Sequence, residues 1–285
     1  MNVRDAVLRV AVVQIAYGDD ESMDDRIERV AALVRAQAGH DLVVLPELWA
    51  PGGFSYREWA SRAQPVEGSI GSAMSAAARD AGVLLHAGSI IERASSGHEG
   101  SSEVGSDGRG LWNTSLLYGP DGGLVAAYRK IHRFGFGSGE PKLMDAGEDI
   151  VLVDLPSGEF SEVSAPHRAA LSTCYDLRFP ELYRRQLDAG ATVFIVPAAW
   201  PAARVRHWTL LAHARAIENQ CVVIACNTGG THAGTEMGGH SQVISASGEA
   251  LAMAGSGEQV LSVDVDLDAI TTWRDQFPVL QDRRL

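Results

Sequence analysis

Hydrophobic and polar positions along the first hundred residues follow two periods, which predict short buried strands separated by amphipathic helices. Residues 8–16, "LRVAVVQIA", form an apolar run typical of a buried strand. Residues 22–40 place apolar side chains every three or four positions, which predicts a helix. Ser22 suits its N-cap and Gly39 its C-terminal stop.

The same two periods continue to the C-terminus. They predict strands at 41–47, 83–92, 169–174, 192–200, 221–227 and 259–267, helices at 69–81, 180–189 and 206–219, and hairpins within 111–130, 150–172 and 240–255. Residues 93–110 are rich in Ser and Gly and predict a surface loop, ordered or disordered. Because the pattern resumes directly after this loop, we expect one α/β domain over residues 1–285, with sheets that mix parallel and antiparallel strands.

The composition narrows the class of protein. The chain has 285 residues and a net charge of −12, which argues against binding to a nucleic-acid backbone. It contains no apolar run of the roughly 18 residues that a membrane span needs. The N-terminus lacks the pattern of a signal peptide, and the three cysteines include no CxxC spacing. We therefore expect reduced thiols and a cytoplasmic protein.

Three polar residues stand at the ends of predicted strands. Glu47 follows "DLVVLP", Lys130 ends "LVAAYRK" and Cys174 ends "RAALSTC". Reacting groups collect beyond strand ends in sheets of this kind, so an acid, an ammonium and a thiol could meet there. Each residue taken alone also fits a structural role, as a solvated acid, a surface lysine or a small core thiol.

The turn after Cys174 distinguishes this thiol from Cys221 and Cys226, which lie inside an apolar strand pattern. The segment Tyr-Asp-Leu-Arg-Phe leads into a helix that begins near Pro180. A thiol close to a helix N-terminus tends to have a lowered pKa, which predicts a reactive thiolate at Cys174.

Three segments, "LPELW" (45–49), "YRKIH" (128–132) and "STCYDLRFPELYR" (172–184), resemble the signatures of the nitrilase, or carbon–nitrogen hydrolase, superfamily, in the same order. The resemblance spans nearly the whole chain. It implies a four-layer α-β-β-α sandwich of two mixed sheets that forms a homodimer or higher homo-oligomer through a helical layer. It also implies a catalytic triad of Glu47, Lys130 and Cys174.

These residue types suit hydrolysis of a carbon–nitrogen bond next to a carbonyl. Cys174 attacks carbon, Glu47 serves as general base and acid, and Lys130 with the backbone N–H of Tyr175 stabilises the oxyanion. Similar superfamily members carry a second glutamate between the Lys and Cys segments. Glu140 is the nearer match for this position and Glu148 is the alternative.

The downstream segment "VPAAWPAARVRHWTLLAHARAIENQ" resembles ω-amidases, which hydrolyse the terminal amide of 2-oxo dicarboxylic monoamides such as 2-oxoglutaramate. This resemblance implies a cation for the distal carboxylate, with Arg178 as the candidate and Arg204 as a second contact. Trp200 would line the pocket wall. The alternative for Arg178 is a structural role, in which it forms a salt bridge with Glu181.

Other functions stay open at this point. Hydrolysis of N-carbamoyl amino acids or carbamoylputrescine and aliphatic amidase activity belong to the same superfamily. A binding protein that has lost catalysis on this fold is the alternative from another class, although it would not need all three residues of the triad. The histidines show no HExxH or paired-cysteine spacing, and the glycines at 135–139 do not match a dinucleotide fingerprint, so we expect no metal and no cofactor.

Overall fold

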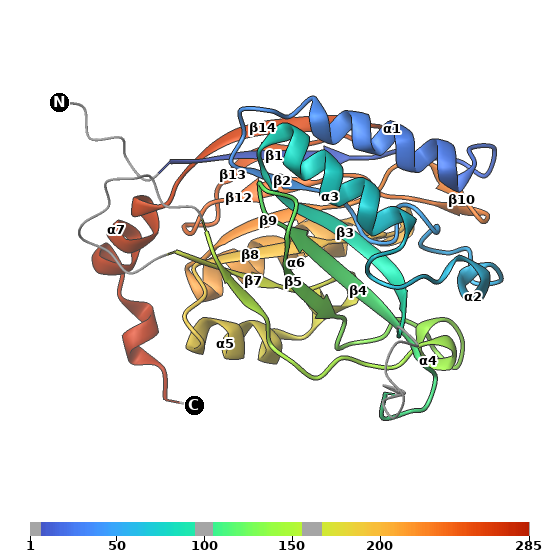
Figure 1. Ribbon diagram of the computed structural model, residues 1–285. Helices are drawn as coiled ribbons and strands as arrows, with labels where there is room; N and C mark the ends of the chain where they lie inside the picture. Colours follow the sequence, from blue (N-terminus) through green and yellow to red (C-terminus); the bar gives the residue numbers. More distant parts are fainter. Residues whose placement is uncertain (1–6, 95–104, 156–166, 285) are drawn as a thin grey trace.

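Two six-stranded sheets lie face to face in the computed structural model, which describes residues 7–94, 105–155 and 167–284 (Figure 1). In spatial order the first sheet consists of β14 (Gln259–Asp266), β1 (Val7–Gln14), β2 (Leu42–Val44), β3 (Leu84–Arg93), β4 (Leu111–Tyr118) and β5 (Leu124–Arg129). In this sheet β1, β2 and β3 are parallel and the outer pairs are antiparallel.

The second sheet repeats this arrangement. In spatial order it consists of β13 (Ala250–Met253), β12 (Gln242–Ile244), β9 (Val222–Cys226), β8 (Val193–Pro197), β7 (Arg168–Leu171) and β6 (Leu152–Asp154). Its central strands β7, β8 and β9 are parallel, and the flanking pairs are antiparallel. Both sheets are therefore mixed, as expected.

Helices cover the outer face of each sheet. Helices α1 (Met23–Arg35) and α3 (Ser69–Ala81) pack on the first sheet, and α5 (Pro180–Asp188) and α6 (Val205–Asn219) pack on the second. Short elements complete the fold: α2 (Trp59–Arg62), α4 (Glu140–Leu143), η1 (Cys174–Arg178), η2 (Ala202–Arg204), β10 (Thr231–His232), β11 (Thr235–Glu236), α7 (Asp268–Gln276) and η3 (Val279–Asp282). The predicted α-β-β-α sandwich is confirmed.

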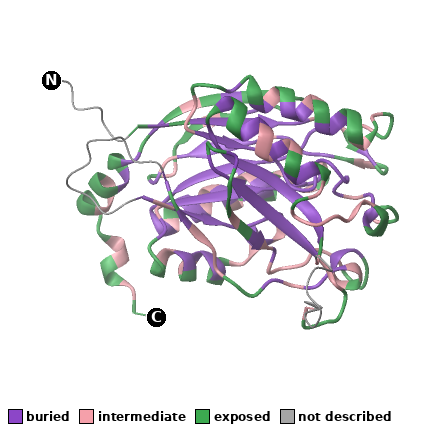
Figure 2. Ribbon diagram, in the orientation of Figure 1, coloured by how far each residue is buried: buried purple, intermediate pink, exposed green. Residues whose placement is uncertain are grey.

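The layers enclose three apolar cores. The central core lies between the sheets and contains branched side chains from both, such as Val12, Ile195 and Ile224. The other two lie between each sheet and its helices. Figure 2 shows the consequence, with buried strands inside and with α1 and α3 exposed on their outer sides. Burial on both faces explains why the central strands are continuous apolar runs.

The structure shifts several element boundaries. Helix α1 ends at Arg35, well before the expected stop at Gly39, because the side-chain amide of Gln37 takes the carbonyl of Leu33 that would accept the next helical hydrogen bond. Helix α7, which was not among the predicted elements, follows the closing strand, and only Ile270 of this helix is buried. Most of the expected loop at 93–110, and the connection within the hairpin of β6 and β7, lie outside the described residues.

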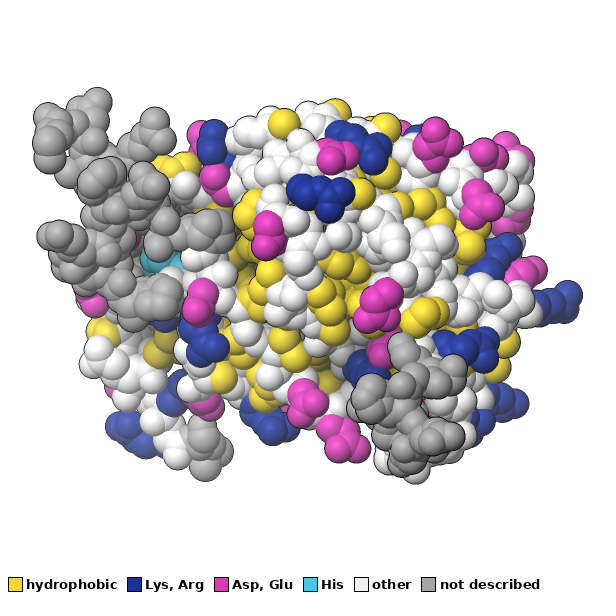
Figure 3. Space-filling model, viewed as in Figure 1, with side chains coloured by type: hydrophobic (Ala, Val, Ile, Leu, Met, Phe, Trp, Pro, Cys, Tyr) yellow, Lys and Arg dark blue, Asp and Glu magenta, His cyan; other side chains and the backbone are white. Residues whose placement is uncertain are grey.

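Charged side chains of both signs are intermixed on the face shown in Figure 3, around a centre where hydrophobic side chains are visible. Within the described residues, no helix is both long and apolar enough to cross a membrane.

Candidate active site

Three strand ends bring the sequence-predicted residues to one place. Glu47 follows β2 and Lys130 follows β5, both in the first sheet, whereas Cys174 follows β7 in the second. Nζ of Lys130 lies 2.8 Å from Oε1 of Glu47, and the two side chains are only 2% and 4% exposed. Cys174 is also buried and lines the same pocket as Glu47 and Lys130. The acid, the ammonium and the thiol therefore form one buried cluster.

Glu140, and not Glu148, is the second glutamate of this cluster. Nζ of Lys130 donates to Oε1 of Glu140 at 3.0 Å, and the Glu140 side chain is buried at the start of α4. The backbone N–H of Phe134 donates to the other oxygen of Glu140. Glu148 is exposed and lines a different cavity. Lys130 is thus held between two carboxylates.

Asn113 of β4 is a member of the cluster that the sequence reasoning missed. Its Nδ2 donates to Oε1 of Glu47 at 2.8 Å and to Oε1 of Glu140 at 2.7 Å. The backbone N–H of Ala199 donates to Oε2 of Glu47 at 2.9 Å. Both oxygens of Glu47 therefore have fixed donors, which sets the carboxyl plane. An amide inside the apolar run "LWNTSLLY" was the available sequence signal.

Cys174 sits on a strained turn. Cys174 has φ +49°, a conformation that is uncommon outside glycine, and it opens the 3-10 turn η1. The N–H of Thr173 donates to Oδ2 of Asp176 at 2.8 Å, which closes the turn beneath the thiol. Such a turn directs the side chain out of the strand and into the site.

The surroundings of Cys174 correct the expectation of a lowered pKa. Burial raises the pKa of the thiol well above its ordinary value, the Glu47 carboxylate raises it further, and Lys130 only partly opposes them. The helix expected near Pro180 is present as α5, but burial and the Glu47 carboxylate determine the direction of the shift. The resting thiol is therefore protonated and needs a base.

The other charges of the cluster are shifted by the same burial. Burial alone would lower the pKa of Lys130, but the carboxylates of Glu140 and Glu47 outweigh it and raise the pKa well above the ordinary value. Burial also raises the pKa of Glu140, an effect that Lys130 opposes and Glu47 reinforces. Lys130 is accordingly a permanent cation at the centre of the site.

A pocket with about 410 Å³ of empty space opens above the cluster. It is lined by Glu47, Leu48, Gly53, Phe54, Tyr56, Trp59, Lys130, Phe134, Glu140, Cys174, Tyr175, Arg178, Ala199, Trp200, Pro201 and Arg204. All residues that the sequence suggested for the substrate, namely Tyr175, Arg178 and Trp200, lie on its wall, as does Arg204.

Arg178 and Arg204 are the cations at the outer part of the pocket. The Arg178 guanidinium lies over the ring of Trp200 at 4.6 Å and close to His207, and that of Arg204 lies 5.5 Å from the ring of Phe134. In the part of the chain that the structure describes, neither arginine has a carboxylate partner, so a salt bridge between Arg178 and Glu181 is absent there. Tyr56, missed from the sequence, presents its ring to the same pocket, and burial raises its pKa to about 12.

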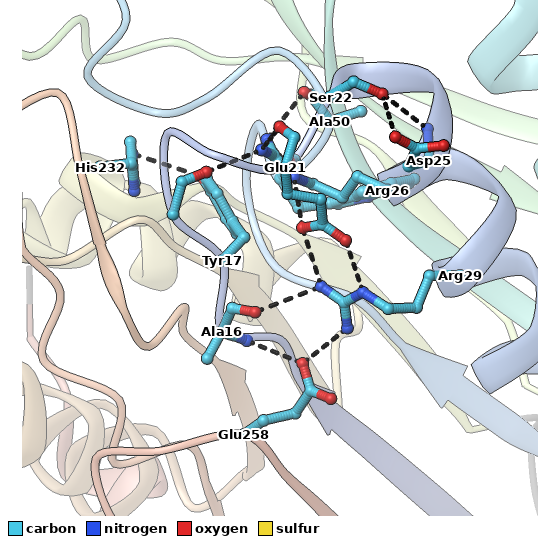
Figure 4. A network of polar contacts seen from close by, with 12 residues as sticks. Ala16, Tyr17, Glu21, Ser22, Asp25, Arg26, Arg29, Ala50, His232 and Glu258 are labelled. Atoms are coloured by element: carbon cyan, nitrogen blue, oxygen red, sulfur yellow. Dashed lines mark hydrogen bonds and ion pairs between the residues drawn. The ribbon is translucent and has the colours of Figure 1, made fainter.

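A polar network around Tyr17 and Arg26 (Figure 4) adjoins the pocket through a hydrogen bond from Gly53. The ring of Tyr17 lies between the guanidinium of Arg26, at 4.0 Å, and the stacked ring of His232, at 4.4 Å. The N–H of Gly53 donates to the Tyr17 hydroxyl at 3.3 Å. Among the described residues, no group of three or more His, Cys, Asp or Glu side chains could hold a metal ion.

Comparisons with known proteins agree with this geometry. The sequence matches the family model described as "Carbon-nitrogen hydrolase" over residues 9–275. It is 43% identical to a 2-oxoglutaramate amidase of Paenarthrobacter nicotinovorans, over 97% of this chain and 90% of the relative. It is 31% identical to the human omega-amidase NIT2, over 97% and 95% of the two chains.

Solved structures show the same fold. A CN-hydrolase superfamily protein of Xanthomonas campestris, solved with an arsenic adduct in its active site, superimposes with a TM-score of 0.84 at 29% identity, with 98% of each chain covered. Nit3 of Saccharomyces cerevisiae, a member of branch 10 of the nitrilase superfamily, superimposes with a TM-score of 0.80 at 27% identity, with 98% and 97% covered. The chain therefore belongs to the carbon–nitrogen hydrolase family and is a hydrolase of carbon–nitrogen bonds.

Proposed function

We propose that this enzyme hydrolyses the terminal amide of a small 2-oxo dicarboxylic monoamide such as 2-oxoglutaramate, releasing ammonia. The observation that carries the proposal is a small pocket with two unlike ends. A buried thiol, carboxyl and ammonium form its floor, and Arg178 and Arg204 stand on its outer wall without carboxylate partners among the described residues. The names of the relatives, 2-oxoglutaramate amidase and omega-amidase, agree with this substrate.

In the first step Cys174 attacks the amide carbon. The thiol is protonated at rest because burial and Glu47 raise its pKa, so Glu47 takes the proton as the C–S bond forms. The resulting oxyanion is stabilised by Lys130 and by the backbone N–H of Tyr175. Donors of this kind typically contribute about 3 kcal/mol each to the transition state.

In the second step the C–N bond breaks. Glu47, now protonated, gives its proton to the leaving nitrogen, ammonia departs and a thioester to Cys174 remains. Glu47 then removes a proton from water, which attacks the thioester carbon, and the free acid and the thiol are restored. Glu140 holds Lys130 in place through the bond at 3.0 Å and keeps its charge balanced.

Substrate choice follows from the outer wall of the pocket. A dicarboxylic monoamide carries a carboxylate at the end opposite the amide, and a guanidinium can bind it in bidentate fashion. Stacking of Arg178 on Trp200 orients its planar group toward the pocket. N-carbamoyl compounds and simple aliphatic amides, the alternatives from the same family, are not favoured by the named relatives. A binder without catalysis has no need of the buried cluster.

We also propose a single hydrolase domain over the whole chain, a homodimer and a cytoplasmic location. Helix α6 supports the dimer, because Leu210 and Ile217 on its outer side are 56% and 55% exposed. Unpaired cysteines at Cys174, Cys221 and Cys226 support a reducing compartment. Light scattering of wild type and Leu210→Glu tests the dimer, since a charge on this face should give a monomer.

A panel of amides tests the substrate. We expect ammonia release to be fastest from 2-oxoglutaramate, and Arg178→Ala to raise KM for dicarboxylic monoamides and not for neutral amides. Loss of one charged hydrogen-bonding partner should weaken binding about tenfold or more. Arg206→Ala is the matched control, because Arg206 is exposed and outside the pocket. Turnover of N-carbamoyl compounds alone would contradict the proposal.

A further inference from the structure

We propose that Asp176 is a positioning residue that holds Lys130 against the thiol of Cys174. Asp176 lies two residues after Cys174 in the turn η1, and its side chain is fully buried. The inference rests on the catalytic roles proposed above for Lys130 and Cys174. In this proposal Asp176 contacts neither the substrate nor the thiol, and it acts through hydrogen bonds to the segment around Lys130 and to the turn that carries Cys174.

The carboxylate of Asp176 accepts four hydrogen bonds, two on each oxygen. Oδ2 accepts from the Tyr128 hydroxyl at 2.7 Å and from the N–H of Thr173 at 2.8 Å. Oδ1 accepts from the backbone N–H of His132 at 2.9 Å and lies 2.8 Å from Nδ1 of the same residue. The His132 ring is further fixed by stacking on Phe179, with centroids 3.8 Å apart.

These partners come from both sides of the site. Tyr128 and His132 lie two residues before and two after Lys130, on β5 and the loop that follows it. Thr173 directly precedes Cys174, at the end of β7. Strand β5 belongs to the first sheet and β7 to the second, so one carboxylate joins the Lys130 segment to the nucleophile turn across the two sheets.

The need for a carboxylate follows from the number of donors. An asparagine at this position has one accepting oxygen, and its nitrogen would face two donors, so two of the four bonds would be lost. The Lys130 segment would then be free to move relative to Cys174. A misplacement of about 1 Å in an active site can cost about 100-fold in rate.

The test compares Asp176→Asn and Tyr128→Phe with wild type. We expect kcat for 2-oxoglutaramate to fall about 100-fold in Asp176→Asn with KM unchanged, and to fall less in Tyr128→Phe, which loses one bond. Tyr128→Phe keeps the ring in the core and carries the test if Asp176→Asn does not fold. In the double variant with both Asp176→Asn and Tyr128→Phe, kcat should be only slightly lower than in Asp176→Asn alone, because both changes break the same connection between the two sheets.

Alkylation of Cys174 by iodoacetamide separates positioning of Lys130 from general damage. Displacement of iodide creates no oxyanion, so it depends on Lys130 only through the pKa of the thiol, which Lys130 lowers. We expect both variants to lose much more of their amide turnover than of their alkylation rate. Equal losses in the two reactions, or no loss of turnover in either variant, would overturn the inference.

Ser115→Ala is the matched control. Its hydroxyl lies 3.0 Å from that of Thr173, so it also joins β4 of the first sheet to the nucleophile turn. Ser115 is paired with Tyr128 in the β4–β5 ladder, but among the described residues its hydroxyl makes no hydrogen bond to Tyr128 or His132, so the change to alanine leaves that pairing in place. This variant should keep both rates. Lys130→Ala distinguishes the two proposals: if it keeps full turnover, the proposed function is wrong, whereas if it loses turnover and the Asp176 and Tyr128 variants do not, only this inference fails.

Discussion

Nζ of Lys130 lies 2.8 Å from Oε1 of Glu47 in a region almost closed to solvent. Glu140 approaches the same nitrogen to 3.0 Å, and Asn113 bridges the two carboxylates. Two buried acids thus share one buried cation. Burying these three charges costs free energy, which their mutual attraction offsets. Replacing any one of the three residues should therefore change both stability and activity.

Lys130→Met should abolish amide turnover and destabilise the fold. The change leaves two carboxylates buried without a cation, and removing one partner of a buried ion pair typically costs about 3–5 kcal/mol. Denaturant unfolding at neutral pH measures the effect, and Lys142→Met, which replaces an exposed lysine of α4, is the control. An unfolding free energy equal to that of wild type would contradict the proposed charge balance.

Activity should be lost toward acid pH earlier than an ordinary glutamate would predict. Burial raises the pKa of Glu140 above its ordinary value of 4.5, so the carboxylate that holds Lys130 takes up a proton as pH falls through this raised pKa. The acid limb of kcat/KM should therefore have its midpoint above pH 4.5.

Glu140→Gln tests the origin of this limb. The variant should have lower kcat, and its residual activity should persist to lower pH because the group with the raised pKa is gone. An acid limb that stays at the same pH in the variant would show that a different group titrates.

Stability should also fall in mild acid, for a separate reason. Burial lowers the pKa of His86 and of His232 from 6.5 to about 4, so both are neutral in the fold and gain protons more readily when unfolded. The stabilisation is complete above pH 6.5 and is lost as pH falls toward 4, at no more than about 1.4 kcal/mol per pH unit for each group.

His232→Phe should reduce this pH dependence. Phenylalanine keeps a ring against Tyr17 and removes the titrating group, although it loses the contact with the Tyr17 hydroxyl at 3.3 Å. Unfolding free energies measured from pH 8 to pH 4 should therefore decline less steeply than in wild type. An unchanged slope would mean that His232 does not contribute.

Local patterns predicted the main strands and helices and the mixed sheets, whereas the four-layer sandwich was implied by the resemblance to the carbon–nitrogen hydrolase superfamily. The helix expected at 69–81 is α3 with the same bounds, because its apolar stripe and Gly82 define both face and end. Glu47, Lys130 and Cys174 could be selected as candidates because they interrupt strand patterns that burial makes easy to recognise. Their mutual distances required coordinates, since they depend on how two sheets pack.

Other features depend on contacts between distant segments. In the sequence, Asn113 looks like an ordinary strand residue. Its role is visible only in the structure, where its side-chain amide donates to both Glu47 and Glu140. The pKa of Cys174 was misjudged because the sequence shows a nearby helix start and does not show burial or the facing carboxylate. The ionisation of a group is set by its three-dimensional surroundings, which sequence spacing does not reveal.

Trapping the acyl group with hydroxylamine tests the central claim, that the buried cluster cleaves amides through a thioester to Cys174. With 2-oxoglutaramate and hydroxylamine, the wild-type enzyme should release ammonia and form a hydroxamate that increases with hydroxylamine, and Cys174→Ala should do neither. Ammonia release by Cys174→Ala at the wild-type rate, or turnover by the wild type with no hydroxamate at any hydroxylamine concentration, would contradict it.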